Sequence, residues 1–308
     1  MNNFFTRHLS VFYLIRLVAR NYYKNYSSIF TDFVLPMIVM TILFNVLEKE
    51  AVSLMLPGIL LSPIASSCFI SFAICYADWK QSIIVKKIRV SQISTTQLFL
   101  SFLIFYFFIS LFSFSFGLSY TLLLSEIGLQ SLENFETSLS KVNWLWGITA
   151  IIQLILIGCV CGYLIGVLSK KTSHVIAMGL TLFLIQSFLL GYYLPVNLII
   201  GKQNTRITSY FMPFYAPTRM FQYNWFKSSE TKVFWYSLNE FKEWVPHYTN
   251  YVSENWKVLN IDGNYLDESS FIKFNFHPSY WSLILLSFGW FATIGTTSTM
   301  ISKYGKFD

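Results

Sequence analysis

Few residues of this chain have the type and spacing that catalysis or metal binding requires. Glu240, Glu243 and His247 lie three and four residues apart, so on a helix they would share a face. Carboxylates and an imidazole placed together support acid–base chemistry, but the same spacing is common on a solvated helix face. The segment 166–172 (GVLSKKT) lacks the second glycine of a phosphate-binding loop and follows an apolar run. We therefore predict no catalytic residue and no metal site in this chain.

The four cysteines, Cys68, Cys75, Cys159 and Cys161, all lie inside apolar runs. Cys159 and Cys161 are two positions apart, so they point in different directions on a helix. A disulfide or a metal site needs converging sulfur atoms, whereas buried cysteines more often act as small packing residues. We expect all four cysteines to be packing residues.

The composition is that of a membrane protein. Of the 308 residues, 54 % are hydrophobic and only 12 % are charged, whereas soluble domains carry about 25 % charged residues. Apolar segments recur that are long enough to cross a hydrocarbon core of ~30 Å, which takes roughly 20 helical residues. We predict an all-α polytopic membrane protein with six transmembrane helices at about 29–47, 51–76, 98–124, 143–168, 174–200 and 279–301.

The first two predicted spans contain Pro36, Pro57 and Pro63. A proline leaves a backbone carbonyl without its helical partner, so we expect a nearby hydroxyl group to bond to that carbonyl. The hydroxyls available in the second span are Ser53, Ser62, Ser66 and Ser67.

Ionisable residues are missing from the interior of every predicted span, and Asp32 is placed near the cytoplasmic end of the first one. Transporters coupled to protons or sodium ions usually have such residues inside the membrane. Their absence counts against ion-coupled transport. The energy for transport against a gradient would then come from another polypeptide.

Residues 4–24 are predicted to form an amphipathic helix that lies on the membrane surface. Its apolar face holds Phe4, Phe5, Val11, Phe12, Ile15, Val18 and Tyr22. The opposite face holds Arg7, Ser10, Arg16, Arg20, Asn21 and Lys24. Aromatic residues opposite basic residues are typical of interfacial helices.

The distribution of lysine and arginine predicts the orientation in the membrane. Four lie in the N-terminal segment, four in the connection 77–97, two directly after the fourth span and two in the C-terminal tail, against only Lys49 and Lys141 in the short connections on the other side. We therefore expect both termini to be cytoplasmic in a multi-pass plasma-membrane protein. The chain then divides into an interfacial helix (1–28), five spans (29–200), an extracellular segment (201–278) and a last span with its tail (279–308).

The cytoplasmic connection 77–97 combines basic and large apolar side chains, which are Lys80, Lys86, Lys87, Arg89, Trp79, Ile83, Ile84, Ile88 and Val90. Ile83, Ile84, Lys87 and Ile88 have the spacing of one helical face. Two interpretations fit this pattern. The connection is either an interfacial loop whose lysines extend toward water or a short helix that docks onto a partner protein.

Two further features concern packing and the outer surface. Gly158, Gly162 and Gly166 recur at every fourth position, which predicts close approach of another helix, in the same chain or in a second subunit. In the extracellular segment, we expect 210–226 to re-enter the outer leaflet and about 227–275 to form a small external subdomain. Its many aromatic residues fit either a small core with an aromatic belt or a ligand-binding surface.

Three features, in this order, resemble the permease subunits of type-2 ATP-binding-cassette transporters. The first is the amphipathic helix 4–24 before the first span. The second is the run KKIRVSQIS (86–94), followed at once by the third span, and the third is the break from Gly191 to Pro195 that precedes two further prolines. The chain departs from the family at two places. The coupling connection of the family starts with a glutamate and a pair of small residues, whereas this chain has Asp78 followed by Trp79 and Lys80. The segment 222–278 is longer than the usual outer connection of the family.

The resemblance implies a half-transporter that pairs with a second copy or with a related permease. A separate ATPase subunit would carry ATP and Mg²⁺, so this chain would be no enzyme and would hold no cofactor. Membrane lipids are the other expected partners, and no nucleic acid is expected. The connection between spans two and three would be the coupling helix, whose candidate docking residues are Trp79, Lys80, Ile83, Ile84, Lys87, Ile88 and Arg89.

In this family, helices two and five of both subunits line the transport route. The resemblance therefore implies a set of polar route candidates, which are Ser62, Ser66, Ser67, Thr181, Gln186 and Ser187. These side chains carry no fixed charge and suit an amphiphile, although ordinary hydrogen bonding between helices would also explain them. We expect export of a lipid-like, drug-like or peptide substrate.

Other functions remain compatible with the sequence. A secondary transporter or channel without an ATPase would transport in the absence of nucleotide. A membrane-bound enzyme acting on lipid or glycan would use the extracellular segment, and would lose activity on alanine substitution of Glu240, Glu243 and His247. A non-transporting subunit would sense a ligand through 201–278.

Overall fold

The computed structural model describes residues 2–47, 49–81, 95–132, 135–169, 171–194, 203–228, 251–252, 257–259, 265–266 and 280–304. Nearly all of these residues are helical. The exceptions are short connections and three strands, β1 (Tyr251–Val252), β2 (Lys257–Leu259) and β3 (Tyr265–Leu266), which pair antiparallel in that order. The predicted helical class is confirmed for this part of the chain. Most of the predicted external subdomain lies outside the described residues.

A bend at Asn25 separates the N-terminal helix from the first candidate membrane span. α1 (Asn2–Lys24) ends there, and α2 (Tyr26–Ile29), the π-helix η1 (Phe30–Val34) and α3 (Leu35–Val46) continue as one run. The side-chain oxygen of Asn25 accepts a hydrogen bond from the Ser28 N–H at 3.4 Å, as an N-cap residue does. The run 26–46 is therefore a new helix.

The second span lies in the interior of the molecule. It consists of α4 (Lys49–Ser66), the π-helix η2 (Ser67–Ser71) and α5 (Phe72–Gln81). Every residue from 54 to 77 is buried, as suits a helix that is apolar on all sides. Pro63 cannot donate to the Ile59 carbonyl, and the Ser62 hydroxyl donates to that carbonyl instead, at 2.7 Å. This is the local compensation expected for a proline inside a span.

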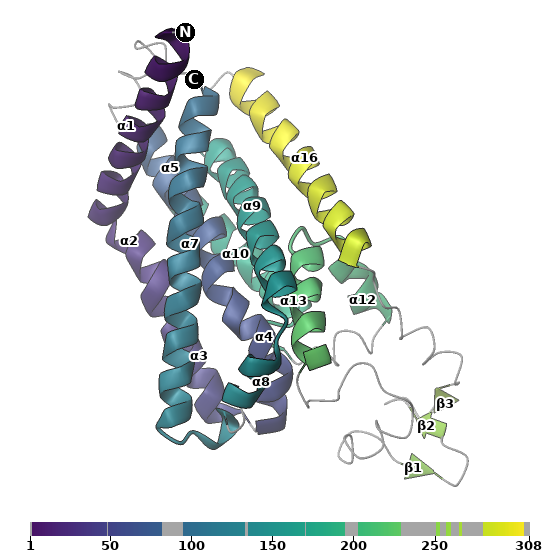
Figure 1. The fold of residues 1–308 in the computed structure, drawn as a ribbon. Helices are drawn as coiled ribbons and strands as arrows, with labels where there is room; N and C mark the ends of the chain where they lie inside the picture. The colour runs from purple at the N-terminus through teal and green to yellow at the C-terminus, as the bar shows by residue number, and fades with distance from the viewer. Residues whose placement is uncertain are drawn as a thin grey trace.

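The other helices pack around this run. They are α7 (Thr95–Glu126), η3 (Gln130–Leu132), α8 (Phe135–Lys141), α9 (Trp144–Leu168), α10 (Thr172–Leu189), α12 (Gln203–Tyr210), α13 (Tyr215–Ser228) and α16 (Tyr280–Tyr304). Figure 1 shows α1 beside the upper part of α7, and α16 on the other side of α9, above α13. Most of the segment 210–226, which was expected to re-enter the outer leaflet, is helical and belongs to α13; its re-entry into a membrane stays a prediction.

Five helical runs of the described residues are long and apolar enough to cross a membrane. They are Tyr26–Val46, Ala51–Gln81, Thr96–Glu126, Trp144–Leu168 and Thr172–Leu189. In α16 the apolar stretch is Leu283–Ser298, which is shorter than these five runs. The sixth span therefore stays a prediction. The fifth span was expected to reach residue 200, but its helix ends at Leu189, because Gly191 adopts a positive φ of 80°.

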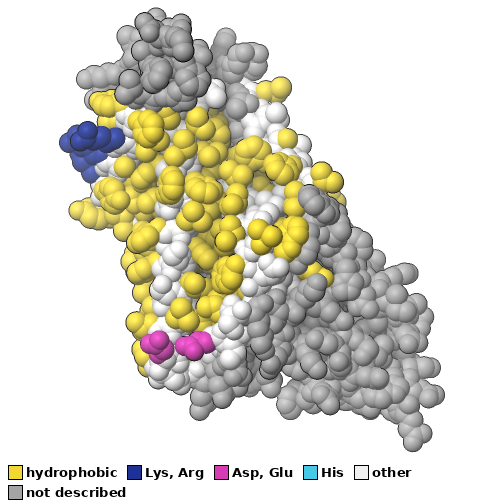
Figure 2. All heavy atoms as spheres, viewed as in Figure 1, with side chains coloured by type: hydrophobic (Ala, Val, Ile, Leu, Met, Phe, Trp, Pro, Cys, Tyr) yellow, Lys and Arg dark blue, Asp and Glu magenta, His cyan; other side chains and the backbone are white. Residues whose placement is uncertain are grey.

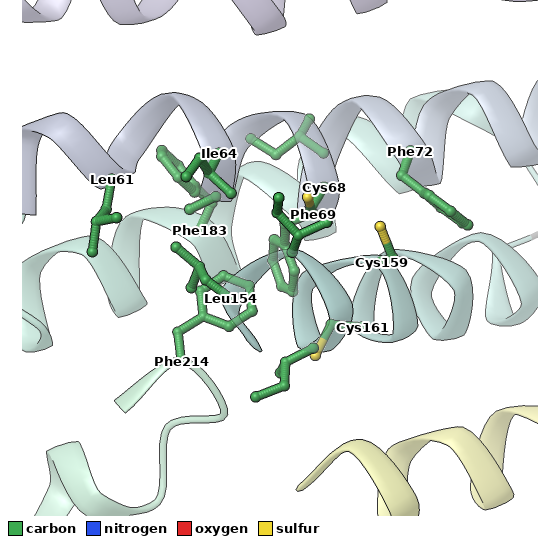
Figure 3. Close-up of a cluster of buried hydrophobic side chains, with 14 of the residues drawn as sticks. Leu61, Ile64, Cys68, Phe69, Phe72, Leu154, Cys159, Cys161, Phe183 and Phe214 are labelled. Atoms are coloured by element: carbon green, nitrogen blue, oxygen red, sulfur yellow. The ribbon is translucent and has the colours of Figure 1, made fainter. Parts of the chain in front are cut away.

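The three glycines of α9 face the second span of the same chain. A Cβ atom added at Gly158 would lie 2.6 Å from the Cβ of Cys68, and one added at Gly162 would lie 2.5 Å from the Cys68 carbonyl oxygen. At Gly166 it would lie 2.8 Å from the Tyr76 ring. Figure 3 shows this contact, with Cys68 and Phe69 on one helix above Leu154, Cys159 and Cys161 on the other. All four cysteines are free and buried, as expected of packing residues.

One stripe of α1 packs against α7, a contact that the sequence did not predict. Leu14, Val18 and Tyr22 are fully buried at intervals of four residues. Phe12, which was assigned to the membrane-facing side, is 72 % exposed. Val18 and Tyr22 were assigned to the same side but are covered by the protein. The position of α1 on a membrane surface stays a prediction.

Charged residues on the visible surface lie at opposite ends of an apolar band (Figure 2). The exposed basic residues of α1, Arg16, Arg20 and Lys24, are at the end where α1 lies, and the exposed Glu126 and Glu136 are at the other end, near α8. Between them the surface is largely hydrophobic. This arrangement is that of a membrane-embedded protein.

Candidate functional site

Polar residues from three separate parts of the chain meet next to the start of the connection 82–94. Asp78, near the end of α5, accepts a hydrogen bond from the Asn25 side-chain amide and another, of 2.6 Å, from the Thr172 hydroxyl. Gln81 donates to the same hydroxyl at 3.4 Å. We call Asn25, Asp78, Lys80, Gln81 and Thr172 the inner junction. It joins the bend after α1, the end of the second span and the first residue of α10.

Lys80 adds a fourth element to the inner junction. Its Nζ donates to the carbonyl oxygens of Val167 at 2.6 Å and Ser169 at 3.3 Å, at the C-terminal end of α9. The last carbonyls of a helix have no partner within the helix and carry partial negative charge, so a lysine there is favourable. The ammonium group of Lys80 is therefore bound within the chain.

The position of Trp79 favours a packing role inside the chain over docking onto a partner. Trp79 is only 1 % exposed, and the edge of its ring meets Phe102 of α7 with ring centroids 5.3 Å apart. Trp79 and Lys80 were candidate docking residues, but both contact helices of the same chain, and we interpret them as anchors for the connection. The other docking candidates, Ile83, Ile84, Lys87, Ile88 and Arg89, lie outside the described residues.

A second polar cluster surrounds Asp32, which lies inside the first candidate span and is 1 % exposed. Its Oδ2 accepts hydrogen bonds from the Tyr22 hydroxyl at 2.6 Å and from the Ser71 hydroxyl at 3.1 Å. Asp32 was expected near the cytoplasmic end of the first span, and the helical run Tyr26–Val46 places it about two turns from the start of that run. Hydropathy places Asp32 near a helix end, whereas the bend at Asn25 starts the span six residues before it.

The two π-helices lie against each other at Asp32, which belongs to η1 and contacts Ser71 of η2. A π-helix widens the turn and frees carbonyl groups, and such segments occur often at functional sites. Hydroxyls of neighbouring helices bond to the freed groups here: Ser113 donates to the Asp32 carbonyl at 2.5 Å, and Ser66 donates to the Thr31 carbonyl at 3.2 Å.

Tyr22 belongs to α1, outside the candidate spans, and its environment keeps the hydroxyl protonated. Burial, and after it the adjacent Asp32 carboxyl, raises the pKa of the Tyr22 phenol well above its ordinary value. At neutral pH Tyr22 is therefore a hydrogen-bond donor to Asp32. This bond joins α1 to the first span across the bend at Asn25.

The third polar cluster fixes the C-terminal end of α10. The Tyr192 N–H donates to the Ser187 carbonyl at 2.9 Å around Gly191, which completes a Schellman-type helix end. A Cβ at Gly58 of α4 would lie 2.2 Å from the Gly191 carbonyl oxygen, so this turn packs directly on the second span. The predicted break therefore occurs at Gly191, while Pro195 lies outside the described residues.

Arg219 of α13 is a buried cation next to this turn. It is 8 % exposed, donates to Gln222 Oε1 at 2.8 Å and lies over the Tyr215 ring at 5.5 Å. Gln222 in turn donates to the Leu190 carbonyl at 2.9 Å. Within the described ranges Arg219 forms no ion pair, so its charge is stabilised by an amide oxygen and an aromatic face.

Five of the six route candidates are buried inside the single chain: Ser62, Ser66, Ser67, Gln186 and Ser187. Gln186 Oε1 and Ser187 Oγ are buried without a hydrogen-bond partner. Thr181 is exposed on α10. Ser62, Ser66 and Ser67 belong to the second span, and Gln186 and Ser187 belong to α10. All five lie in the packed interior, and their part in a transport route stays a prediction. Glu240, Glu243 and His247 lie outside the described residues.

No model of a known protein family matches this chain, and neither a curated protein nor a solved structure matches it. The described residues establish a helical, membrane-embedded protein with three polar clusters.

Asn25, Thr172 and Arg219 were not predicted from the sequence as members of these clusters. Asn25 carries a weak signal, because a polar residue with N-cap character stands between two helical runs. Thr172 has no comparable signal, since Asp78 is 94 positions away. The partners of Arg219, Tyr215 and Gln222, lie on its own helix at spacings of four and three residues, which the sequence does show.

Proposed function

We propose that this chain is the permease subunit of a type-2 ATP-binding-cassette exporter, operated by a separate ATPase in the plasma membrane. The observation that supports it most is the inner junction, where Asp78 binds both Asn25 and Thr172. The connection 82–94 directly follows this junction. A partner that moved the connection would therefore act on several helices at once.

Each contact in the inner junction would pass a movement of the connection to a particular helix. The connection continues α5, and α5 belongs to the second span. Asp78 links α5 to the bend at Asn25 and to the start of α10, while Lys80 links it to the end of α9. In the proposed mechanism, ATP hydrolysis on the partner displaces the connection, and the second and fifth spans move together. An amphiphilic substrate then passes between two permease copies.

Asp32 favours a second candidate function. An ionisable residue inside a membrane helix is typical of transporters coupled to a proton or a cation. The buried carboxyl of Asp32 therefore supports a secondary transporter as the alternative. The two functions differ in their need for nucleotide.

The deciding experiment is purification of the tagged chain from its own host after cross-linking in the membrane, followed by identification of attached proteins. We expect a nucleotide-binding subunit to be recovered. The double variant Ile84→Asp with Lys87→Glu should lose it, because apolar contact and positive charge at the docking face are both removed.

The matched control is Tyr23→Asp with Lys24→Glu, which changes net charge by the same amount on exposed positions of α1. It should retain the nucleotide-binding subunit. Recovery of that subunit by the Ile84 and Lys87 variant would remove the coupling assignment. Substrate transport by the purified chain in vesicles without nucleotide would support the secondary transporter instead.

A further inference from the structure

We propose that Asp32 is a proton-binding site inside the membrane-spanning part of the chain, and that its Oδ1 carries the proton in the conformation described here. The site is formed by Tyr22, Asp32 and Ser71, with Ser67 and Tyr106 around it. A permease driven by an ATPase does not require such a site. The inference therefore stands apart from the proposed function and is tested without a transport assay.

The two oxygen atoms of Asp32 have different surroundings. Oδ2 accepts from the Tyr22 hydroxyl at 2.6 Å and from the Ser71 hydroxyl at 3.1 Å. Oδ1 is fully buried and has no hydrogen bond of ordinary length and angle, although the Ser67 hydroxyl also interacts with the carboxyl group. An ionised carboxylate spreads its charge over both oxygens and needs donors at each, whereas a carboxylic acid places a hydrogen on one of them. The asymmetry is that of a carboxylic acid whose carbonyl oxygen is Oδ2.

The groups that face Asp32 supply no compensating positive charge. α1 contributes Tyr22, α7 contributes Tyr106 and Ser113, and the second span contributes Ser71 and Cys75. Each of these is neutral when protonated, and the nearest charged group acting on Cys75 is another acid, Asp78. Among the described residues no lysine, arginine or histidine pairs with Asp32. A buried charge without a counter-charge is costly, and such groups neutralise instead.

A proton fits this site better than a metal ion does. The Tyr22 and Ser71 hydroxyls direct their hydrogen atoms toward Oδ2, so their positive ends already occupy that side of the carboxyl group. Tyr106 also donates, to the Ser71 carbonyl at 3.0 Å, which removes another oxygen ligand. Donors that point inward repel a cation, whereas a proton on Oδ1 is held by a covalent O–H bond and needs no set of oxygen ligands. A buried O–H without an acceptor costs less than a buried carboxylate without a counter-charge.

Release of this proton would have a structural consequence. The ionised carboxyl would recruit additional donors or water, which requires η1 and η2 to separate at the site. Tyr22 bonds to the same carboxyl, so α1 would follow the change. We therefore expect α1, η1 and η2 to be in close contact when Asp32 is protonated and to lie farther apart when it is ionised.

The test is infrared spectroscopy of the purified full-length chain in lipid nanodiscs near neutral pH. A protonated carboxyl group has a carbonyl stretch in a region where ionised carboxylates do not absorb. We expect such a band in the wild-type chain, its loss in Asp32→Asn, and its retention in Asp78→Asn, which removes the more accessible carboxylate of the inner junction. Absence of an Asp32-dependent band near neutral pH would overturn the inference.

Two further measurements keep the test decisive if Asp32→Asn folds poorly. Labelling the aspartate carboxyl carbons of the unchanged chain with carbon-13 should shift the band, which assigns it to aspartate without a variant. Thermal unfolding is then compared in sodium and choline chloride. Equal transition temperatures of the unchanged chain support the proton, whereas a higher transition temperature in sodium chloride would assign the site to a metal cation and contradict the proposal.

Discussion

The side chain of Tyr22 joins the N-terminal helix to the buried carboxyl of the first span. Its hydroxyl lies 2.6 Å from Asp32 Oδ2, and its ring lies edge-on to Phe105 and Tyr106 with centroids 5.3 and 6.0 Å away. The ring contacts are apolar and would survive loss of the hydroxyl. The contribution of the hydrogen bond can therefore be measured separately.

Replacing Tyr22 by Phe removes this hydrogen bond and leaves the ring. We expect the free energy of unfolding to fall by ~1–3 kcal/mol, because a buried acceptor loses a donor. Tyr23→Phe is the matched control, since Tyr23 is the next residue and is 64 % exposed. Thermal unfolding of the purified chain in detergent should show a lower transition temperature for Tyr22→Phe alone. Equal values for both variants would contradict the assigned role.

Comparison of the wild-type chain with Tyr22→Phe also predicts how stability depends on pH. Burial raises the pKa of Tyr22 in the folded chain, so its stabilising contribution is fully present below the unfolded-state pKa of about 10. Above that pH the unfolded chain ionises and the contribution declines. The difference in transition temperature between wild type and Tyr22→Phe should therefore be constant from pH 6 to 9 or so and shrink at higher pH. A difference that grows above this range would mean that Tyr22 is already ionised when folded.

At the scale of elements, the close contact of α9 with the second span depends on the absence of side chains. A Cβ at Gly162 would be 2.5 Å from one backbone oxygen and 3.3 Å from the next, those of Cys68 and Phe69. Backbone atoms cannot move aside as a flexible side chain can. The two helices would have to separate.

Gly162→Ala should therefore destabilise the chain by ~1–3 kcal/mol, the usual cost of overpacking, despite the better helix propensity of alanine. Gly179→Ala of α10 is the control, because its Cβ would meet Ile70 at an ordinary 3.9 Å. Transition temperatures in detergent compare the two. If Gly162→Ala were as stable as Gly179→Ala, the close approach of α9 to the second span would be refuted.

The inner junction predicts how α10 is held at its first turn. Thr172→Val keeps the shape of the side chain and removes the hydroxyl that donates to Asp78. Loss of a hydrogen bond to a charged group costs about 1.5–3 kcal/mol, so hydrogen exchange of the first turn of α10 should accelerate roughly tenfold or more. Thr181→Val, on the exposed side of the same helix, should leave that exchange unchanged. Identical exchange in both variants would show that Asp78 does not hold α10.

At the scale of the whole molecule, we expect the two charged ends of the apolar band to lie on opposite sides of the membrane. Ser140 of α8 is exposed at the acidic end, and Lys171 is exposed beside the inner junction. All four natural cysteines are buried, so they should react little with an external reagent.

We expect an impermeant maleimide added to intact cells to label Ser140→Cys, and to label Lys171→Cys only after permeabilisation. The physical reason is the excess of lysine and arginine on the side assigned to the cytoplasm. Labelling of Lys171→Cys in intact cells, with Ser140→Cys protected, would reverse the orientation. Mass spectrometry of the labelled chain identifies the modified residue.

The sequence by itself determined that the chain is helical and membrane-embedded, because continuous apolar length is a local property that no distant contact alters. It also indicated close packing at the α9 glycines, since spacing along one helix fixes a shared face. The break from Gly191 to Pro195 was predicted from the family resemblance, while the fifth span was expected to reach residue 200. The structure ends the helix before Gly191, whose φ is positive.

Only the tertiary structure decided what the polar residues do. Asp78 and Thr172 are 94 positions apart, and Ser71 and Asp32 are 39 apart, so no local pattern links them. The same holds for α1, where contact with α7 buried Leu14 and left Phe12 exposed. Burial and hydrogen bonding depend on which helices become neighbours. The burial and the contacts of a residue such as Asp32 or Trp79 are therefore decided by packing, and its position along the chain does not reveal them.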